Sequence, residues 1–188
     1  AMNYKVKVYR LDTINSCFKD AIKTLASPNA LRTGGGPHDS PYIINAIKVD
    51  KLLNEEVLVS VAENGEICIW RTEHLDEPPM IFNNNGVSTW GIALHSEQGL
   101  LAVSANNFKI TVYNMLELTK EKPVFGAASI AVKYWLKDTD KIEFEGHNHN
   151  IPNIDFNATG RYIASASIDS TCKVWDLYRR QLVSSTKV

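Results

Sequence analysis

Three residue types that many hydrolytic enzymes combine occur close together near the end of the chain: His147, Ser165 and Asp169. An imidazole that takes the serine proton, oriented by a carboxylate, would turn the hydroxyl into a nucleophile. The chain contains no Gly-x-Ser-x-Gly segment, which would present such a serine on an exposed turn. The residue types for acyl transfer are therefore present without the usual local structure, and we expect no catalytic residues here.

Metal and cofactor chemistry has even less support. His147 and His149 would face the same side of a strand, but a zinc site needs three or four ligands and no further ligand follows at a recognisable spacing. Gly34-Gly-Gly36 lacks the Lys-Ser/Thr continuation of a phosphate loop. We expect no metal, no cofactor and no disulfide framework, because the cysteines are odd in number and far apart: Cys17, Cys68 and Cys172.

The segments that carry these residues recur along the chain. Residues 57–70, 100–113 and 162–175 each read as an apolar strand, a polar turn and an alternating strand that ends on an aromatic ring. The rings are Trp70, Tyr113 and Trp175. Six positions before each ring stands a residue that hydrogen-bonds its own backbone in turns: Asn64, Asn107 and Asp169. We predict three β-hairpins.

Each hairpin has a further strand candidate on either side, which makes units of four strands. The preceding candidates are residues 43–49, 90–94 and 151–156, and the following ones are 80–82, 141–144 and 181–183. Residues 4–11 resemble the ring-bearing strand of an earlier unit, with Tyr9 at the ring position. The predicted divisions are a terminal strand (1–13), a connection rich in turn residues (14–41), and three units (42–85, 86–145 with an insertion near 114–134, and 146–188).

The last unit resembles a WD repeat of a β-propeller, through Gly146-His147, Asp155, Ser165-Ala-Ser167-Ile-Asp169 and Trp175-Asp176. The resemblance implies an all-β fold with about three full blades plus part of another, a portion of a seven-bladed propeller. In that family a histidine, serine, aspartate and tryptophan form one hydrogen-bonded network. These structural roles would fall on His147, Ser165 (or Ser167, on the same face), Asp169 and Trp175.

The second unit carries a narrower resemblance, in residues 88–95 (STWGIALH), 101–107 (LAVSANN) and 110–113 (ITVY). These strings are similar to fungal WD-repeat regulators of ribonucleotide-reductase gene transcription, a family also described as receptor-like subunits of a cullin ubiquitin ligase. The resemblance implies protein partners, among them a cullin-ligase adaptor. Such receptors often carry Trp-Asp-x-Arg; here the arginine comes one position late or the aspartate is missing. The candidate partner-binding residues are Arg71, Asp176, Arg179 and Arg180.

Composition narrows the function classes. The 20 basic residues nearly cancel the 21 acidic ones, so direct DNA or RNA binding is an alternative that would depend on a local stripe of Lys5, Lys7, Arg10, Lys19 and Lys23. No apolar run approaches the ~20 residues that span a bilayer. We expect a soluble nuclear or cytoplasmic protein that acts as a noncatalytic interaction scaffold. An enzyme centred in a propeller channel would need clustered acids or histidines, whereas His38, His74 and His95 are expected in loops or at the rim.

Overall fold

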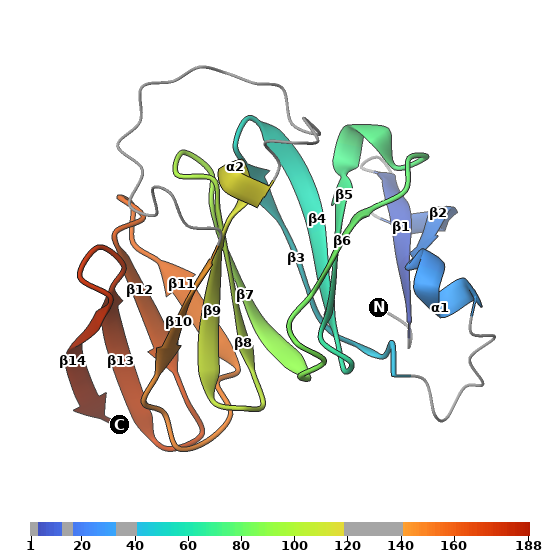
Figure 1. The fold of residues 1–188 in the computed structure, drawn as a ribbon. Coiled ribbons are helices and arrows are strands. Elements are labelled where there is room, and N and C mark those ends of the chain that lie inside the picture. The colour runs from blue at the N-terminus through green and yellow to red at the C-terminus, as the bar shows by residue number, and fades with distance from the viewer. Residues whose placement is uncertain (1–3, 13–16, 33–40, 119–140) are drawn as a thin grey trace.

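The computed structural model describes residues 4–12, 17–32, 41–118 and 141–188. Within these residues the chain is built from antiparallel strands, with two short helices and one 3-10 turn at Thr72–His74. The strands form four sheets, each of which follows the order of the chain. Figure 1 shows the sheets side by side in chain order, from blue at the N-terminus to red at the C-terminus. The predicted all-β fold is confirmed.

The N-terminal pair consists of β1 (Lys5–Asp12) and β2 (Cys17–Ala26), and α1 (Pro28–Arg32) follows it. The sequence predicted only a connection over 14–41. Ser27-Pro28, read as a linker signal, instead begins a helix: Pro28 is its first residue, and the Ser27 hydroxyl accepts the Asn29 N–H at 3.1 Å. Gly34–Pro37 lie outside the described residues. Among those described, no helix has the length and apolar character needed to cross a membrane.

The prediction that Tyr9 occupies a ring position is wrong. Tyr9 is 45% exposed, whereas Val6 of the same strand is buried beside Leu25. Both pack in the cluster that contains Trp70 of the next sheet. β1 therefore turns Val6, and not Tyr9, toward the first four-stranded sheet.

Three four-stranded sheets make up the rest of the fold and agree with the predicted units. The first sheet comprises β3 (Ile44–Leu52), β4 (Glu55–Ala62), β5 (Glu66–Arg71) and β6 (Met80–Asn83). The second comprises β7 (Thr89–His95), β8 (Leu100–Ala105), β9 (Lys109–Asn114) and β10 (Lys141–Glu145). The third comprises β11 (Asn153–Phe156), β12 (Tyr162–Ala166), β13 (Thr171–Asp176) and β14 (Gln181–Lys187). Of the predicted insertion near 114–134, only Asn114, which ends β9, and the helix α2 (Met115–Leu118) lie within the described residues.

The three hairpin turns are built as the sequence predicts. In each, the side-chain oxygen of the predicted turn residue accepts the backbone N–H two positions later, at 3.1 Å for Asn64, 3.3 Å for Asn107 and 2.9 Å for Asp169. The residue after it has a positive φ in every case: Gly65, Phe108 and Ser170. Asn and Asp therefore close these turns by the local hydrogen bond that made them turn candidates.

Successive sheets pack face to face and share their cores. One cluster joins the first and second sheets through Val59, Ile69, Leu101 and neighbouring aliphatic side chains. A second cluster joins the second and third sheets and includes Phe144 and Trp175. The leading strands β3, β7 and β11 lie next to one another, which is the arrangement of blades in a propeller. The sheets are thus successive blades of a partial β-propeller.

Candidate functional site

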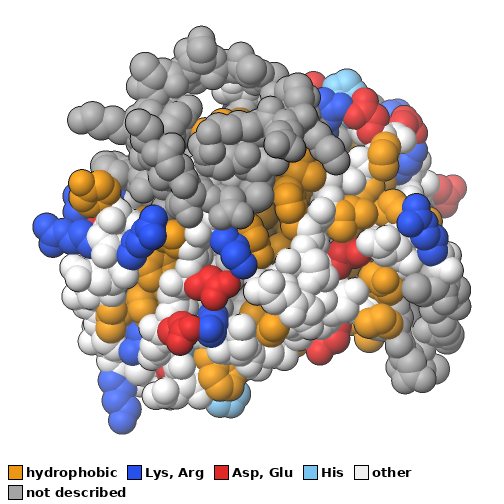
Figure 2. All heavy atoms as spheres, viewed as in Figure 1, with side chains coloured by type: hydrophobic (Ala, Val, Ile, Leu, Met, Phe, Trp, Pro, Cys, Tyr) orange, Lys and Arg blue, Asp and Glu red, His pale blue; other side chains and the backbone are white. Residues whose placement is uncertain are grey.

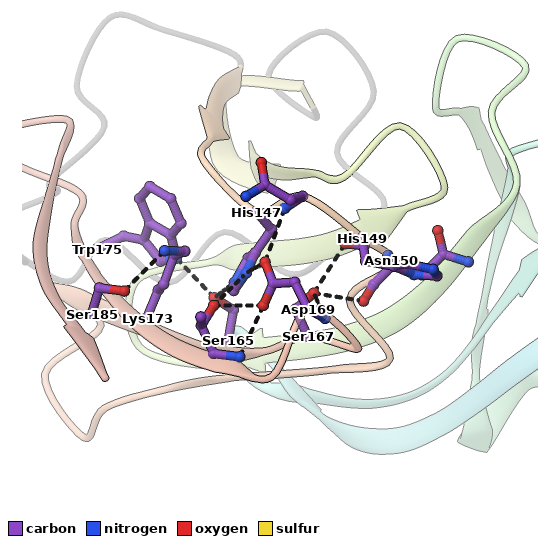
Figure 3. A network of polar contacts seen from close by, with 11 residues as sticks. His147, His149, Asn150, Ser165, Ser167, Asp169, Lys173, Trp175 and Ser185 are labelled. Atoms are coloured by element: carbon purple, nitrogen blue, oxygen red, sulfur yellow. Dashed lines mark hydrogen bonds and ion pairs between the residues drawn. The ribbon is translucent and has the colours of Figure 1, made fainter. Parts of the chain in front are cut away.

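The third sheet assembles the polar network that the sequence predicted (Figure 3). His147 lies in the loop before β11, Ser165 in β12, Asp169 in the β12–β13 turn and Trp175 in β13. His147 Nδ1 is 2.9 Å from Asp169 Oδ2, and His147 Nε2 is 2.7 Å from Ser165 Oγ. The Trp175 indole N–H donates to Ser165 Oγ at 2.9 Å.

One assignment of the protons satisfies every group in this network. The indole N–H donates to Ser165, the Ser165 hydroxyl donates to His147 Nε2, and the His147 Nδ1–H donates to Asp169. All four side chains then have partners in a site that water scarcely reaches, since the His147 side chain is 0% exposed. Such a network stabilises one arrangement of the loop and both strands, because any missing member would leave a buried polar group unpaired.

Asp169 gathers more hydrogen bonds than any other residue of the network. Its carboxylate accepts the Thr171 hydroxyl at 2.6 Å and the Asn148 backbone N–H at 2.9 Å, besides the His147 ring. Burial pushes the pKa of Asp169 upward, but these hydrogen bonds outweigh burial and hold the pKa well below its ordinary value. The residue is therefore an anion that fixes the loop before β11 onto the β12–β13 turn.

Packing explains the glycine beside the histidine. Gly146 has a φ of +147°, and a Cβ at this position would lie 3.0 Å from the Trp175 ring. The same indole packs on Phe144 of β10, with ring centroids 5.5 Å apart. Only glycine lets the chain pass this close to the tryptophan, so the Gly-His pair belongs to the same structure as the network.

Ser167 was the alternative to Ser165 in the network, and His149 was considered with His147 as a metal-binding pair. Both make other contacts. The Ser167 hydroxyl bonds the His149 and Asn150 carbonyl oxygens at 3.0 and 2.9 Å and accepts the Asp169 backbone N–H at 3.1 Å, so of the two serines only Ser165 contacts the His147 and Trp175 rings. The His149 ring stacks on Phe108 with centroids 6.0 Å apart. Within the described residues no group of three or more His, Cys, Asp or Glu side chains is arranged to hold a metal ion.

The second sheet contains a corresponding network that the sequence did not predict. Asn84 Oδ1 accepts the Tyr113 hydroxyl at 3.1 Å and the Thr111 hydroxyl at 3.2 Å, and its amide N–H donates to Thr89. Burial and the nearby Glu143 raise the pKa of Tyr113 to about 12, so the phenol keeps its proton and donates. Asn84 precedes its ring by nearly the same interval as His147 precedes Trp175, and that spacing was the available signal.

Comparison with known proteins agrees with this geometry. Residues 139–176, which contain the whole network, match the family model described as WD domain, G-beta repeat. This segment is a WD repeat. The chain is also 35% identical over 162 residues to a WD40 repeat-containing protein of Dictyostelium discoideum, an alignment that covers 86% of the chain and 22% of that relative.

A second WD relative extends the comparison. A WD repeat-containing protein of Schizosaccharomyces pombe is 27% identical over 147 residues, which cover 78% of the chain and 29% of the relative. The chain thus spans less than a third of the length of either relative. Both alignments extend well beyond the matched WD repeat. The first and second sheets, which lack the Gly-His and Trp-Asp pairs, therefore also take part in the sequence similarity to these relatives.

The WD-repeat network stabilises the fold, and its serine is not accessible to a substrate. Ser165 is 3% exposed and its oxygen already contacts two ring nitrogens, so no acyl group can approach it. Cys68 is equally unsuited to nucleophilic chemistry, because burial and then Glu66 raise the pKa of its thiol to about 12. Cys172, by contrast, lies on the exposed side of the third sheet.

The four candidate partner-binding residues differ in their burial and in their ion pairs. Arg71 is tied to Glu55, 3.8 Å away, and to Glu77. Asp176 is 1% exposed and accepts the Arg161 guanidinium at 2.8 Å, so the expectation that it contacts a partner is corrected: it is an internal anchor. Arg179 and Arg180 are exposed in the β13–β14 turn, and their role in partner binding stays a prediction.

The remaining histidines and the basic stripe also have defined positions. His95, expected in a loop or at the rim, is buried at the end of β7, and its Nε2 lies 3.1 Å from the Ala158 carbonyl oxygen of the third sheet. His74 lies 3.9 Å from Glu77, and His38 falls outside the described residues. Of the predicted basic stripe, Lys23 pairs with Asp76, which places an acid beside the stripe.

Proposed function

We propose that this chain is part of a noncatalytic protein-interaction scaffold, the general role of WD-repeat proteins. The observation that carries the proposal is the β13–β14 turn. Asp176 Oδ1 accepts the backbone N–H groups of Tyr178 and Arg179 at 2.9 and 3.0 Å, while Oδ2 accepts Arg161. The turn is therefore fixed from within, and it presents Tyr178, which is 65% exposed, beside Arg179.

Arginine and tyrosine on a preorganised turn suit recognition of another protein. Both residue types are enriched among those that dominate binding energy, and a turn that is already ordered loses little entropy on binding. Arg161 adds to the rigidity, because its guanidinium lies 5.1 Å from the Tyr162 ring centre and 6.0 Å from that of Tyr178. Arg179 has no acidic partner among the described residues, so its charge is available.

We further propose that the parent protein is a nuclear or cytoplasmic regulatory subunit, of the kind that controls ribonucleotide-reductase transcription or receives substrates for a cullin ligase. This finer proposal is supported by the sequence resemblance of β7, β8 and β9. We also propose that further blades, on chain beyond these residues or on a partner, complete a seven-bladed ring. The structure supports ring completion through the outward face of the third sheet, where Ala164 and Cys172 are exposed.

The test is a pull-down from fungal extract with the full-length parent protein, its Arg179→Ala variant and an Arg10→Ala control. Arg10 is also an exposed arginine, but it lies in β1 at the other end of the chain. Recovery of a cullin and its adaptor, reduced by Arg179→Ala alone, is the expected result. Equal recovery with both variants would remove the turn from the interface, and recovery of other regulatory proteins without a cullin would remove the ligase role.

Direct nucleic-acid binding and catalysis gain no comparable support. On the face shown in Figure 2, basic and acidic side chains are interspersed and do not form one basic stripe. Binding through phosphates would require several unpaired lysines or arginines and would fall steeply with salt. His147, Ser165 and Asp169, the residue types that could perform acyl transfer, are all hydrogen-bonded within the WD-repeat network.

A further inference from the structure

Trp90 stands out as an exposed indole on an otherwise buried strand. It is 38% exposed at the start of β7, whereas Thr89 and the residues from Gly91 to His95 are buried. Its N–H donates to the Ser88 hydroxyl oxygen at 3.1 Å. The ring is thus held in one orientation with part of its surface free, although burying an indole is ordinarily favourable.

The hydrogen bond from Trp90 continues to an acidic side chain. The Ser88 hydroxyl donates to Glu63 Oε2 at 2.8 Å, and the Asn45 amide donates to the same oxygen at 3.0 Å. Glu63 lies just after β4, whereas Asn45 lies in β3 and Ser88 directly precedes β7, so groups of two leading strands hold the carboxylate. An anionic carboxylate is therefore fixed two hydrogen bonds from the indole.

Not every acid in the described part of the chain has a lysine or arginine partner, and Glu63 is one of those without such a partner. Several others have one: Glu55, Asp76, Glu77, Glu143, Glu145, Asp155 and Asp176 each lie within ion-pair distance of a lysine or arginine. Among the described residues no cation lies over the Trp90 ring either; those that contact rings do so at tyrosines. Within residues 4–12, 17–32, 41–118 and 141–188, no basic group therefore occupies either the carboxylate or the indole.

A second aromatic surface lies alongside. The Asn106 N–H donates to the Ser88 carbonyl oxygen at 2.9 Å, which fastens the β8–β9 turn to the backbone two residues before Trp90. That turn presents Phe108, 36% exposed and stacked on His149, with a φ of +64°. The equivalent positions in the first and third sheets are Gly65 and Ser170, so the second sheet alone places an aromatic ring at this positive φ.

We propose that Trp90 and Glu63 form a recognition site for a lysine or arginine side chain of a partner peptide, with Phe108 and His149 supporting the adjoining residues. The cation would lie over the indole face and be attracted electrostatically by the Glu63 carboxylate. Both hydrogen bonds that the Glu63 side chain accepts within the described structure go to Oε2, so Oε1 can accept a hydrogen bond from the cation. The site rests on the proposed scaffold function but is separate from the Tyr178–Arg180 turn. The Trp90–Glu63 site would bind a basic side chain, whereas the Tyr178–Arg180 turn carries arginines and would bind acidic groups.

The test is a titration of the 188-residue chain with acetyl-Gly-Gly-Arg-Gly-Gly-amide, observed through the indole N–H signals in a ¹H–¹⁵N NMR spectrum. The matched probe replaces arginine by citrulline, which keeps the shape of the side chain and removes its charge. The Trp90 signal is assigned by its loss in Trp90→Phe. We expect a saturable shift of this signal with the arginine peptide, and binding at least fivefold weaker with citrulline.

Three variants make the assignment specific. Glu63→Gln keeps an oxygen that can accept from Ser88 and Asn45 but removes the charge, and it should weaken arginine-peptide binding about tenfold. Glu97→Gln is the matched control, an exposed acid at the other end of β7, and should leave binding unchanged. Phe108→Gly suits the positive φ and should weaken binding without lowering the unfolding midpoint.

The outcomes separate this site from the scaffold proposal. A Trp90 signal that does not move, equal binding of the citrulline peptide, or equal weakening by Glu97→Gln and Glu63→Gln would overturn the cation site. Each of these results leaves the pull-down through Arg179 untouched. Conversely, a failed pull-down with intact peptide binding would overturn the turn as an interface and keep the Trp90–Glu63 site.

Discussion

The hydroxyl of Ser165 is the point at which the WD-repeat network can be broken with the least change of volume. Ser165→Ala removes one oxygen, yet it strands two buried groups, the Trp175 N–H and His147 Nε2, which lie 2.9 and 2.7 Å from it. Each buried group that loses its partner costs ~1 to 3 kcal/mol, so we expect Ser165→Ala, which strands two, to lower the free energy of unfolding by about 2 to 6 kcal/mol.

A double-mutant cycle tests the reason for that loss. Trp175→Phe removes the indole N–H and should itself destabilise by about 1 to 3 kcal/mol, through the lost hydrogen bond and the smaller ring. In the double variant Ser165→Ala/Trp175→Phe no indole N–H is left unpaired. Its loss of stability should therefore be about 1 kcal/mol smaller than the sum of the single losses.

The assay is urea unfolding at pH 7, followed by far-UV circular dichroism, with the slope against urea compared among variants to confirm a common unfolding transition. Ser184→Ala is the control, because Ser184 is exposed in β14 of the same sheet and should change stability by less than ~0.5 kcal/mol. Single losses that add within ~0.5 kcal/mol, or a Ser165→Ala variant as stable as the control, would refute the shared hydrogen bond as the source of stability.

Three further predictions follow from the same contacts. The pKa of Asp169 is lowered in the folded protein, so the stability that its carboxylate contributes is complete above the ordinary aspartate pKa and is lost as pH falls through the lowered value. Asp169→Asn should therefore lower the free energy of unfolding at pH 7 and flatten the decline in urea midpoints between pH 5 and 2. Asp155→Asn, at an exposed aspartate, should do neither. Asn84→Ala should cost about 2 to 3 kcal/mol by stranding two hydroxyls, and an unchanged melting curve would contradict its role. Iodoacetamide at pH 8 should modify Cys172 in the folded protein and Cys68 only in urea, since burial raises the pKa of the latter to about 12; peptide mass spectrometry that finds early labelling of Cys68 would contradict this.

How far the sequence predicts this structure depends on whether a residue acts within its own repeat. The resemblance of the third unit to a WD repeat implies the roles of His147, Ser165, Asp169 and Trp175, because all four residues lie within that one unit. The turn residues Asn64 and Asn107 were found for the same reason, since their hydrogen bonds reach only two positions along the chain.

Asn84 shows where that reasoning stops. It performs the hydrogen bonding that His147 performs in the third sheet, but with an amide in place of an imidazole and a tyrosine hydroxyl in place of an indole. A search for the Gly-His pair cannot detect such a replacement, whereas the interval to the ring can. The helix α1 was not predicted for a different reason: Ser27-Pro28 is both a linker signal and a helix start, and only the Asn29 N–H bond distinguishes them.

Contacts between sheets were beyond the sequence altogether, and they explain why an exposed site can be rigid. At one end of β3 and β7, the Leu53 N–H donates to the Ser96 carbonyl oxygen at 3.1 Å. At the other end, Asn45 donates to Glu63 and to Ser88. Two leading strands fastened at both ends cannot slide or splay, so Glu63 and the Trp90 ring keep their separation without a ligand. A fixed separation reduces the entropy lost on binding, and for this reason a single basic side chain can be expected to bind measurably.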